Sequence, residues 1–204
     1  MFLGRALTIL SWDNPVTAYF RKSRKLRHSL GRPSRSDFVH FQYVEQLDKL
    51  EFGGEVSIVK NRVVDEEIVL VRYYPNYKTT LAWYQDLDLC KQVDNRDTVY
   101  DLELLKCMYK YLNKHGDLFY IKYKNRLCGD VCLQPSGEVN IVISKSFQNK
   151  HIGRRVINEI IQLAKEKDIQ ELRAEIYSFN TQSQKMFQSI GFKKVDDEQY
   201  ILTL

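Results

Sequence analysis

Residues 141–161 read IVISKSFQNKHIGRRVINEII and contain the junction that decides the fold. An apolar strand pattern ends near Ser144, a short polar loop follows, and apolar residues then recur with helical period from about 151 to 167. The apolar stripe of this helix comprises Ile152, Val156, Ile160 and Ala164. A strand that leads directly into a long amphipathic helix indicates a protein in which helices pack on a sheet.

The loop of this junction has the composition of an anion site. The first amides of a helix have no partner within the helix, and the helix dipole adds partial positive charge there. Gly153 would let a phosphate approach closely, while Lys150, Arg154 and Arg155 add charge and hydrogen-bond donors. From spacing alone, an ordinary helix start with one glycine and several basic residues remains an alternative.

The sequence on both sides of the junction alternates between strand and helix patterns. Turn signals at Asn125-Arg126 and Pro135-Ser136-Gly137 separate three strands of a meander. The predicted strands are 66–74, 117–124, 127–134, 138–146, 171–177, 192–196 and 199–204, and the other predicted helices are 77–86, 99–114 and 180–189. The prediction is an α/β (α+β) fold, with helices on both faces of one mixed, twisted sheet of six to seven strands.

Composition agrees with an ordinary globular domain, because 44% of the residues are hydrophobic and 28% are charged. No stretch is apolar for the roughly 18 to 20 residues that a membrane span requires. The four cysteines lack metal-ligand spacing, so no metal is predicted, and Cys128 and Cys132 are expected to pack on one face of a strand. Reduced, structural cysteines favour a cytoplasmic location.

Residues 1–60 form a basic N-terminal extension, with a helix predicted at 37–50. Residues 21–35 carry seven Lys or Arg and no acid. A solvated tail is the favoured interpretation, and contact with nucleic acid or anionic lipid is the less favoured one. An organellar transit peptide is a minor alternative for residues 1–36.

Two segments at the correct separation resemble the GNAT family of acetyl-CoA-dependent N-acetyltransferases. Residues 148–153 (QNKHIG) resemble its pyrophosphate loop, Q/R-x-x-G-x-G/A. Asn180, Ser183, Phe187 and Gly191-Phe192 resemble its N-x-x-[AS]-x-x-x-[YF]-x-x-x-G-F segment, and Gly129 resembles the glycine common in its third strand. The resemblance implies a GNAT-like fold over residues 64–204, with acetyl-CoA as co-substrate.

The resemblance also implies roles for individual residues. Glu175, five residues before Asn180, stands where GNAT enzymes that use a glutamate base carry one, and strand alternation puts Tyr177 on the same face. A backbone N–H of the strand ending near Ser144 would stabilise the oxyanion, and Asn180 would bind the pantetheine arm or cap its helix. The implied acetyl-CoA contacts are Val142, Ile143, Ser144, Gln148, Asn149, Lys150, His151, Ile152, Gly153, Arg154, Arg155, Asn180, Ser183 and Phe187.

Two positions depart from the family pattern. His151 replaces the usual first glycine of the loop, where a side chain either crowds the diphosphate or contacts it. Phe187 replaces a tyrosine that often protonates the departing thiolate, and Tyr177 is a candidate to supply that proton. The alternative is that Glu175 only lines the cleft and that Tyr177 is a packing residue, which is the favoured interpretation of Tyr177.

The acceptor side is predicted less sharply. Tyr84, Asp86 and Asp130 are candidate contacts for a cationic amine, with solvated surface acids as the alternative. The favoured function is acetyl transfer to a small primary amine, with no metal, membrane or nucleic-acid partner. A protein- or ribosome-directed acetyltransferase and a non-catalytic acyl-CoA sensor are the other functions considered, and a homodimer is left open.

Overall fold

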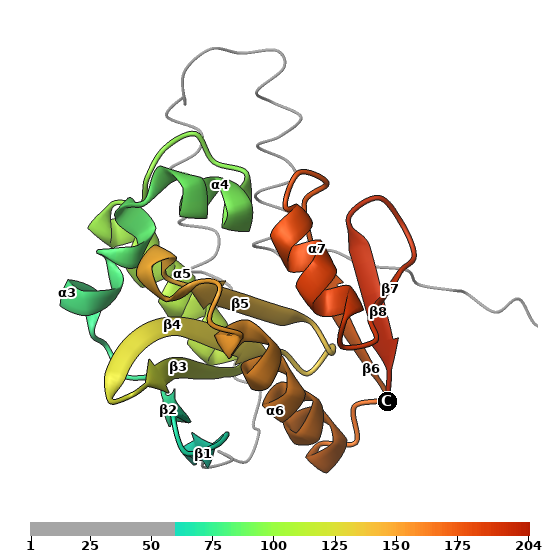
Figure 1. The fold of residues 1–204 in the computed structure, drawn as a ribbon. Coiled ribbons are helices and arrows are strands. Elements are labelled where there is room, and N and C mark those ends of the chain that lie inside the picture. Colours follow the sequence, from blue (N-terminus) through green and yellow to red (C-terminus); the bar gives the residue numbers. More distant parts are fainter. Residues whose placement is uncertain (1–59) are drawn as a thin grey trace, which may run out of the picture. The chain divides into compact units, whose positions relative to one another are not determined.

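The computed structural model describes residues 60–204 (Figure 1). The basic run at 21–35 and the predicted helix at 37–50 lie outside the described residues. Within residues 60–204, no helix is long and apolar enough to cross a membrane.

Five antiparallel strands form the larger sheet, and they lie side by side in chain order. They are β1 (Arg62–Val63), β2 (Ile68–Arg72), β3 (Asp117–Tyr123), β4 (Arg126–Leu133) and β5 (Val139–Ile143). The turn between β3 and β4 has Lys124 and Asn125 at positive φ, which supports the tight reversal that the sequence predicts. Short connections thus produce the predicted meander.

Three strands form a second, smaller sheet in the order β6-β8-β7. They are β6 (Glu171–Glu175), β7 (Lys193–Lys194) and β8 (Gln199–Thr203). One parallel bridge, between Glu138 and Arg173, connects β5 to β6. The single sheet predicted from sequence is therefore divided between β5 and β6.

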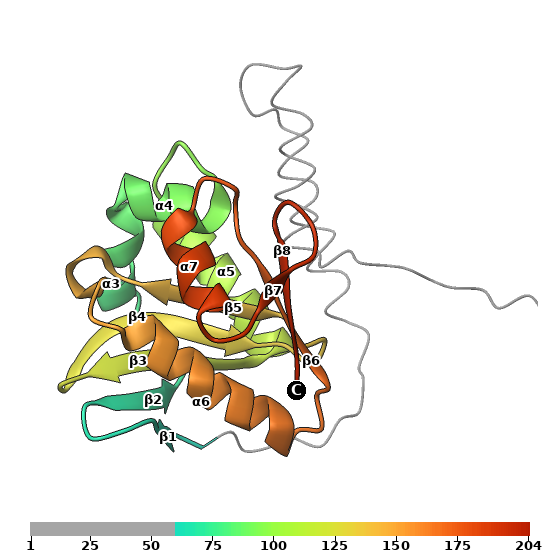
Figure 2. The same cartoon turned by 45° about the vertical axis from the view of Figure 1, so that its right-hand side comes forward.

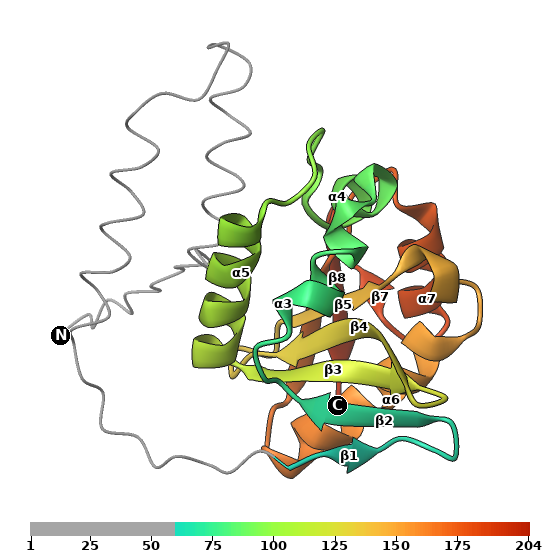
Figure 3. The same ribbon diagram turned by 90° about the vertical axis from the view of Figure 1, so that its left-hand side faces the viewer.

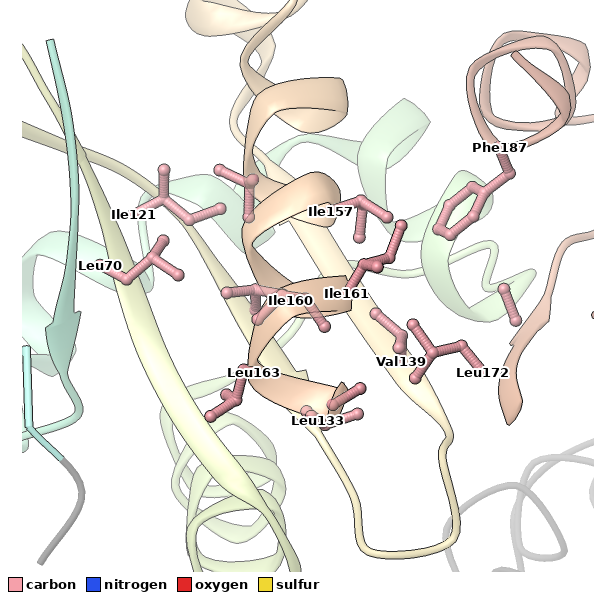
Figure 4. Packing of buried hydrophobic residues seen from close by; sticks show 14 of the residues in the cluster. Leu70, Ile121, Leu133, Val139, Ile157, Ile160, Ile161, Leu163, Leu172 and Phe187 are labelled. Atoms are coloured by element: carbon pink, nitrogen blue, oxygen red, sulfur yellow. The ribbon is translucent and has the colours of Figure 1, made fainter. Parts of the chain in front are cut away.

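Helix α6 (Ile152–Glu166) covers one face of the larger sheet (Figure 2). Its apolar stripe is the predicted one, and Ile152, Val156, Ile160 and Ala164 are all buried. Figure 4 shows side chains of α6 between Leu70 and Ile121 on one side and Leu172 and Phe187 on the other. The helix therefore contributes to one core shared by both sheets.

The opposite face is covered by α5 (Leu102–His115), together with three short elements (Figure 3). These are α3 (Tyr77–Thr80), the 3-10 helix η1 (Trp83–Gln85) and α4 (Leu87–Asp94). They pack with β3 and β4 in a second core rich in tyrosine. Layers of helix on both sheet faces confirm the predicted fold class.

Local details differ from the prediction in three places. The helix predicted at 77–86 is divided into α3 and η1, and Asp86 begins a separate helix by accepting a hydrogen bond from the Leu89 amide (2.9 Å). Strand β1 was not predicted, because its two residues are too short for a pattern. Cys128 and Cys132 were expected on one face of a strand, but they pack in different cores. The β3–β4 pairing shifts by one residue at Ile121/Lys122, and this shift turns the Cys128 side chain to the other face of the sheet.

Candidate functional site

The candidate site lies where β5 and β6 separate. At the closed end of this gap, the Arg173 amide donates to the Gly137 carbonyl (2.9 Å). Gly137 has φ +83, and a Cβ there would be 2.1 Å from the Glu171 carbonyl oxygen. Only glycine fits this close approach. Beyond the bridge β5 and β6 form no further bridge, and within residues 60–204 no strand pairs with this edge of β5.

The pairing of β5 with β4 determines the direction in which each peptide group of β5 points. The Ser144 amide donates to the Cys128 carbonyl (2.8 Å). Because peptide groups alternate between the two edges of a strand, the N–H and C=O of Ile143 point away from β4. The Ile143 carbonyl accepts a hydrogen bond from Gln148 Nε2 (3.0 Å), in agreement with this geometry.

This alternation corrects the predicted backbone contacts. Val142 and Ser144 direct their amides to β4, so of the three predicted residues only Ile143 presents its amide to the gap. Ile141 shares the same edge and was missed, although strand alternation gives the signal for it. Gly129 brings β4 close to this segment, since a Cβ there would be 2.0 Å from the Val142 carbonyl oxygen.

The N-terminus of α6 adjoins this end of β5, through the 3-10 helix η2 (Lys145–Phe147) and residues 148–151. The side chain of the N-cap residue His151 makes no capping hydrogen bond to α6, and the first turn of the helix contains no acid. Asn149 (φ 61) and His151 (φ 57) both adopt the left-handed conformation. That conformation explains why glycine suits position 151, and the exposed His151 side chain occupies it at some cost in strain.

Gly153 is in the first turn of α6, and a Cβ there would meet only Met186 Cε at 3.7 Å, an ordinary contact. The packing of the protein therefore does not require glycine at this position. The Gln148 side chain is hydrogen-bonded to Ile143, and Asn149 Oδ1 accepts from Gln182 Nε2 (3.0 Å). The loop is thus attached both to β5 and to α7 (Thr181–Gln188).

The basic residues of the junction divide into two groups. Lys150 and Arg154 are exposed and have no ion-pair partner within the part of the chain that the structure describes, although Lys150 Nζ lies 5.1 Å from the centroid of the Phe147 ring. Arg155 instead donates to Asp65 (2.5 and 2.7 Å) and Glu67 (2.9 Å). Arg155 therefore connects α6 to the residues around β2, and the predicted role at an anion is not supported by its contacts.

Asn180 is buried and caps α7, because its Oδ1 accepts from the Ser183 amide (3.2 Å). Its Nδ2 donates to the Gln92 carbonyl of α4 (3.3 Å). The capping role considered for Asn180 is thus present, and Ser183 participates through its backbone. Phe187 is 3% exposed and packs edge-to-face on Phe192, with centroids 4.9 Å apart. Its ring belongs to the core, so the implied contact of Phe187 with acetyl-CoA has no support in the structure.

Glu175 and Tyr177 lie at the β6 side of the gap. Leu172, Ala174 and Ile176 pack in the α6 core, so Glu175 and Tyr177 face the opposite side of the strand. Tyr177 follows Glu175 by two residues in the direction that leads away from the bridge at Arg173. At about 3.3 Å per extended residue, Tyr177 therefore lies about 7 Å nearer the open end of the gap than Glu175 does. The Tyr177 ring stacks on Phe179, with centroids 5.5 Å apart.

Two of the predicted acceptor contacts are buried instead. Asp130 is 3% exposed and Tyr84 is 1% exposed. The Asp130 carboxylate accepts hydrogen bonds from Tyr84 (3.1 Å) and from Tyr109 (2.8 Å), a partner that sequence reasoning missed. Burial raises the pKa of Asp130 to about 7, although both tyrosine donors act to lower it. Neither residue is available to a ligand, which corrects the expectation.

Asp86, the third predicted acceptor contact, is half-buried and lines a surface pocket of about 670 Å³. Ser144 lines the same pocket, so the structure brings these two predicted residues together at the end of β5. Within residues 60–204 there is no group of three or more His, Cys, Asp or Glu that could hold a metal ion.

A family model described as Acetyltransferase (GNAT) family matches residues 80–192, more than half of the sequence. The chain belongs to the GNAT acetyltransferase family. The match includes the α6 junction, β6 and α7 of this GNAT domain, and so it covers the elements on both sides of the gap. No curated protein sequence matches the chain significantly.

Solved structures share the GNAT fold at low identity. A GNAT acetyltransferase from Elizabethkingia anophelis with acetyl-CoA bound is 19% identical (TM-score 0.51) and covers 69% of this chain and 100% of its own. A spermidine N-acetyltransferase from Vibrio cholerae, in complex with CoA and spermine, is 12% identical (TM-score 0.57), and the match covers 68% of this chain and 96% of that protein. An acetyltransferase from Salmonella typhimurium that modifies the N-terminal serine of ribosomal protein L7/L12 is 11% identical (TM-score 0.54), and the match covers 71% of this chain and 99% of that protein.

Proposed function

We propose that this GNAT protein transfers the acetyl group of acetyl-CoA to a primary amine of a small molecule. The observation that carries the proposal is the gap between β5 and β6, which opens beside the N-terminus of α6, where the His151 side chain makes no capping hydrogen bond. A nucleotide thioester needs both features, because its diphosphate requires anion-binding amides and its arm requires polar partners along its length.

The diphosphate would be bound by the first amides of α6, with Lys150 and Arg154 adding charge. Gly153 would allow the phosphates to approach the helix closely. The pantetheine arm would follow the open edge of β5, where Ile141 and Ile143 direct their amides toward the gap, much as an added strand does. Asn180, at the start of α7, would contact the same arm from the other side.

The chemistry would be direct attack of the amine nitrogen on the thioester carbon. Most alkylamines are protonated at neutral pH, so a base must first take a proton, and Glu175 is the proposed base, acting through water. As the C–N bond forms, negative charge develops on the carbonyl oxygen and is stabilised by the Ile143 N–H. The C–S bond then breaks, and the thiolate takes up a proton, for which Tyr177 is the proposed donor.

A non-catalytic acyl-CoA sensor is the second candidate, and one observation favours it. Position 187, which often supplies the proton for the thiolate in this family, holds a phenylalanine packed in the core. If Tyr177 does not replace that donor, the protein would bind acetyl-CoA without efficient turnover.

Thiol release from acetyl-CoA over a panel of primary amines separates the two candidates. The proposal predicts amine-dependent thiol release together with formation of the acetylated amine, detected by mass spectrometry. Binding of CoA without thiol release from any amine class would contradict catalysis and support the sensor. Failure to bind CoA would contradict both.

A further inference from the structure

The pocket of about 670 Å³ lies on the sheet face that carries η1, beside the end of β5. It is lined by residues of α3, η1, β4 and η2, and by Ser144, which directly follows Ile143. Trp83, Leu127 and Phe147 supply apolar surface. If the amide of Ile143 marks the reacting carbonyl, this pocket is adjacent to it and is suited to the acceptor.

The charges of the pocket are unbalanced. Lys78, Arg126 and Lys145 contribute positive charge, while Asp86 is the only acid among the lining residues. The Asp86 carboxylate accepts the Leu89 amide and caps α4. Lys145 is paired with Asp88 outside the lining (2.9 Å). Lys78 and Arg126 are the other two cations of the lining.

Lys78 and Arg126 are exposed and have no ion-pair partner anywhere in residues 60–204. The Arg126 guanidinium lies 5.3 Å from the centroid of the Phe147 ring, a cation–π contact at the pocket wall. A guanidinium held in this way can donate two parallel hydrogen bonds to a carboxylate or phosphate. A polycationic amine would meet like charge at both residues.

We infer that the acceptor is an amine that also bears an anionic group, a carboxylate or a phosphate, and that Lys78 and Arg126 select it. This inference rests on the proposed function, and it replaces the predicted contact between a cationic amine and acidic side chains. The apolar surface of Trp83 and Leu127 would hold the part of the acceptor between its amine and its anionic group.

Binding of matched ligands to the CoA-saturated full-length chain tests the inference. The probes are phenylalanine against phenylalaninamide, phosphoethanolamine against ethanolamine, and spermidine. Amide shifts of Ala82, Leu127 and Ser144 report the pocket. We expect at least one anionic member to bind about ten-fold or more tightly than its neutral partner, as expected for a charge-assisted hydrogen bond. The pair that discriminates identifies carboxylate or phosphate as the group recognised.

The variant Lys78→Gln/Arg126→Gln should abolish that preference. The matched variant Lys193→Gln/Lys194→Gln removes two exposed cations from β7 and should retain it. Equal or tighter binding of the neutral amines or spermidine would overturn the inference, as would a panel that leaves the pocket amides unshifted. Thiol release from acetyl-CoA is measured separately. A preference for anionic ligands without thiol release would contradict only the transfer reaction. Thiol release with spermidine alone would contradict only the inferred acceptor class.

Discussion

Ser144 donates its amide to the Cys128 carbonyl, and this hydrogen bond determines which peptide groups of β5 face the gap. Because facing alternates along a strand, Ile143 and Ile141 present their amides there, while Val142 does not. Ser144 also lines the proposed acceptor pocket. The proposed oxyanion donor, Ile143, is therefore next in sequence to a residue of that pocket.

Removing the amide of Ile143 should slow acetyl transfer without preventing CoA binding. Proline is compatible with an extended strand and removes a donor that β4 does not use; the loss of an isoleucine side chain packed against the core is shared with the control at Ile141. We expect Ile143→Pro to lower kcat roughly 100-fold, the usual effect of losing one oxyanion donor. Ile141→Pro is the matched control, since it removes an amide two residues deeper on the same edge. Similar kcat values for the two variants would exclude Ile143 as the donor.

The role of Glu175 has a pH signature. Without a base, turnover depends on the fraction of amine that is already neutral, and this fraction rises with pH. We expect Glu175→Gln to lower kcat roughly 100-fold near neutral pH and to leave CoA affinity unchanged. The kcat of the variant should recover as the pH rises toward the pKa of the amine. Glu171→Gln, at the other end of β6, should resemble the unmodified protein. A loss with Glu175→Gln that is equal at every pH would remove Glu175 as base.

Neighbouring arginines of α6 should affect different properties. Arg154 has no ion-pair partner within residues 60–204, so Arg154→Gln should weaken CoA binding and leave stability unchanged. Arg155 is paired with Asp65, so Arg155→Gln should lower the free energy of unfolding by roughly 1 kcal/mol, as for partly exposed pairs, and spare CoA affinity. Isothermal titration and urea unfolding measure the two effects. The reverse assignment would show that Arg155 leaves Asp65 to bind the cofactor.

Stability should fall as pH rises through the range in which Asp130 titrates. Burial raises the pKa of this carboxyl from 3.8 to about 7, so the native state holds a proton that the unfolded chain releases. Between these values the unfolded state binds fewer protons, and the free energy of unfolding decreases with pH. Asp130→Asn cannot titrate and should show a flatter profile in urea unfolding between pH 4 and 7. Burial also raises the pKa of the half-buried Asp94, but this residue is present in both proteins, so its contribution cancels in the comparison. Parallel profiles would contradict a protonated Asp130.

The sequence predicted the elements whose signals are local and long. The α6 stripe repeats over four turns, and the meander turns have strong residue preferences, so their existence and order were recovered. The division of the sheet was not, because it depends on the Gly137–Arg173 contact between separate segments. For the same reason the burial of Asp130 under Tyr84, and the pairing of Arg155 with residues some 90 positions away, leave no local pattern.

Titration of the full-length chain with CoA, followed through backbone amide resonances, tests the central claim most directly. We predict saturable shifts at Ile143 and at residues 151–154, with Lys193 and Lys194 of β7 unchanged. Amides of residues 141–154 that stay unshifted at saturating CoA would contradict the account, because neither the gap edge nor the start of α6 would then bind the nucleotide thioester.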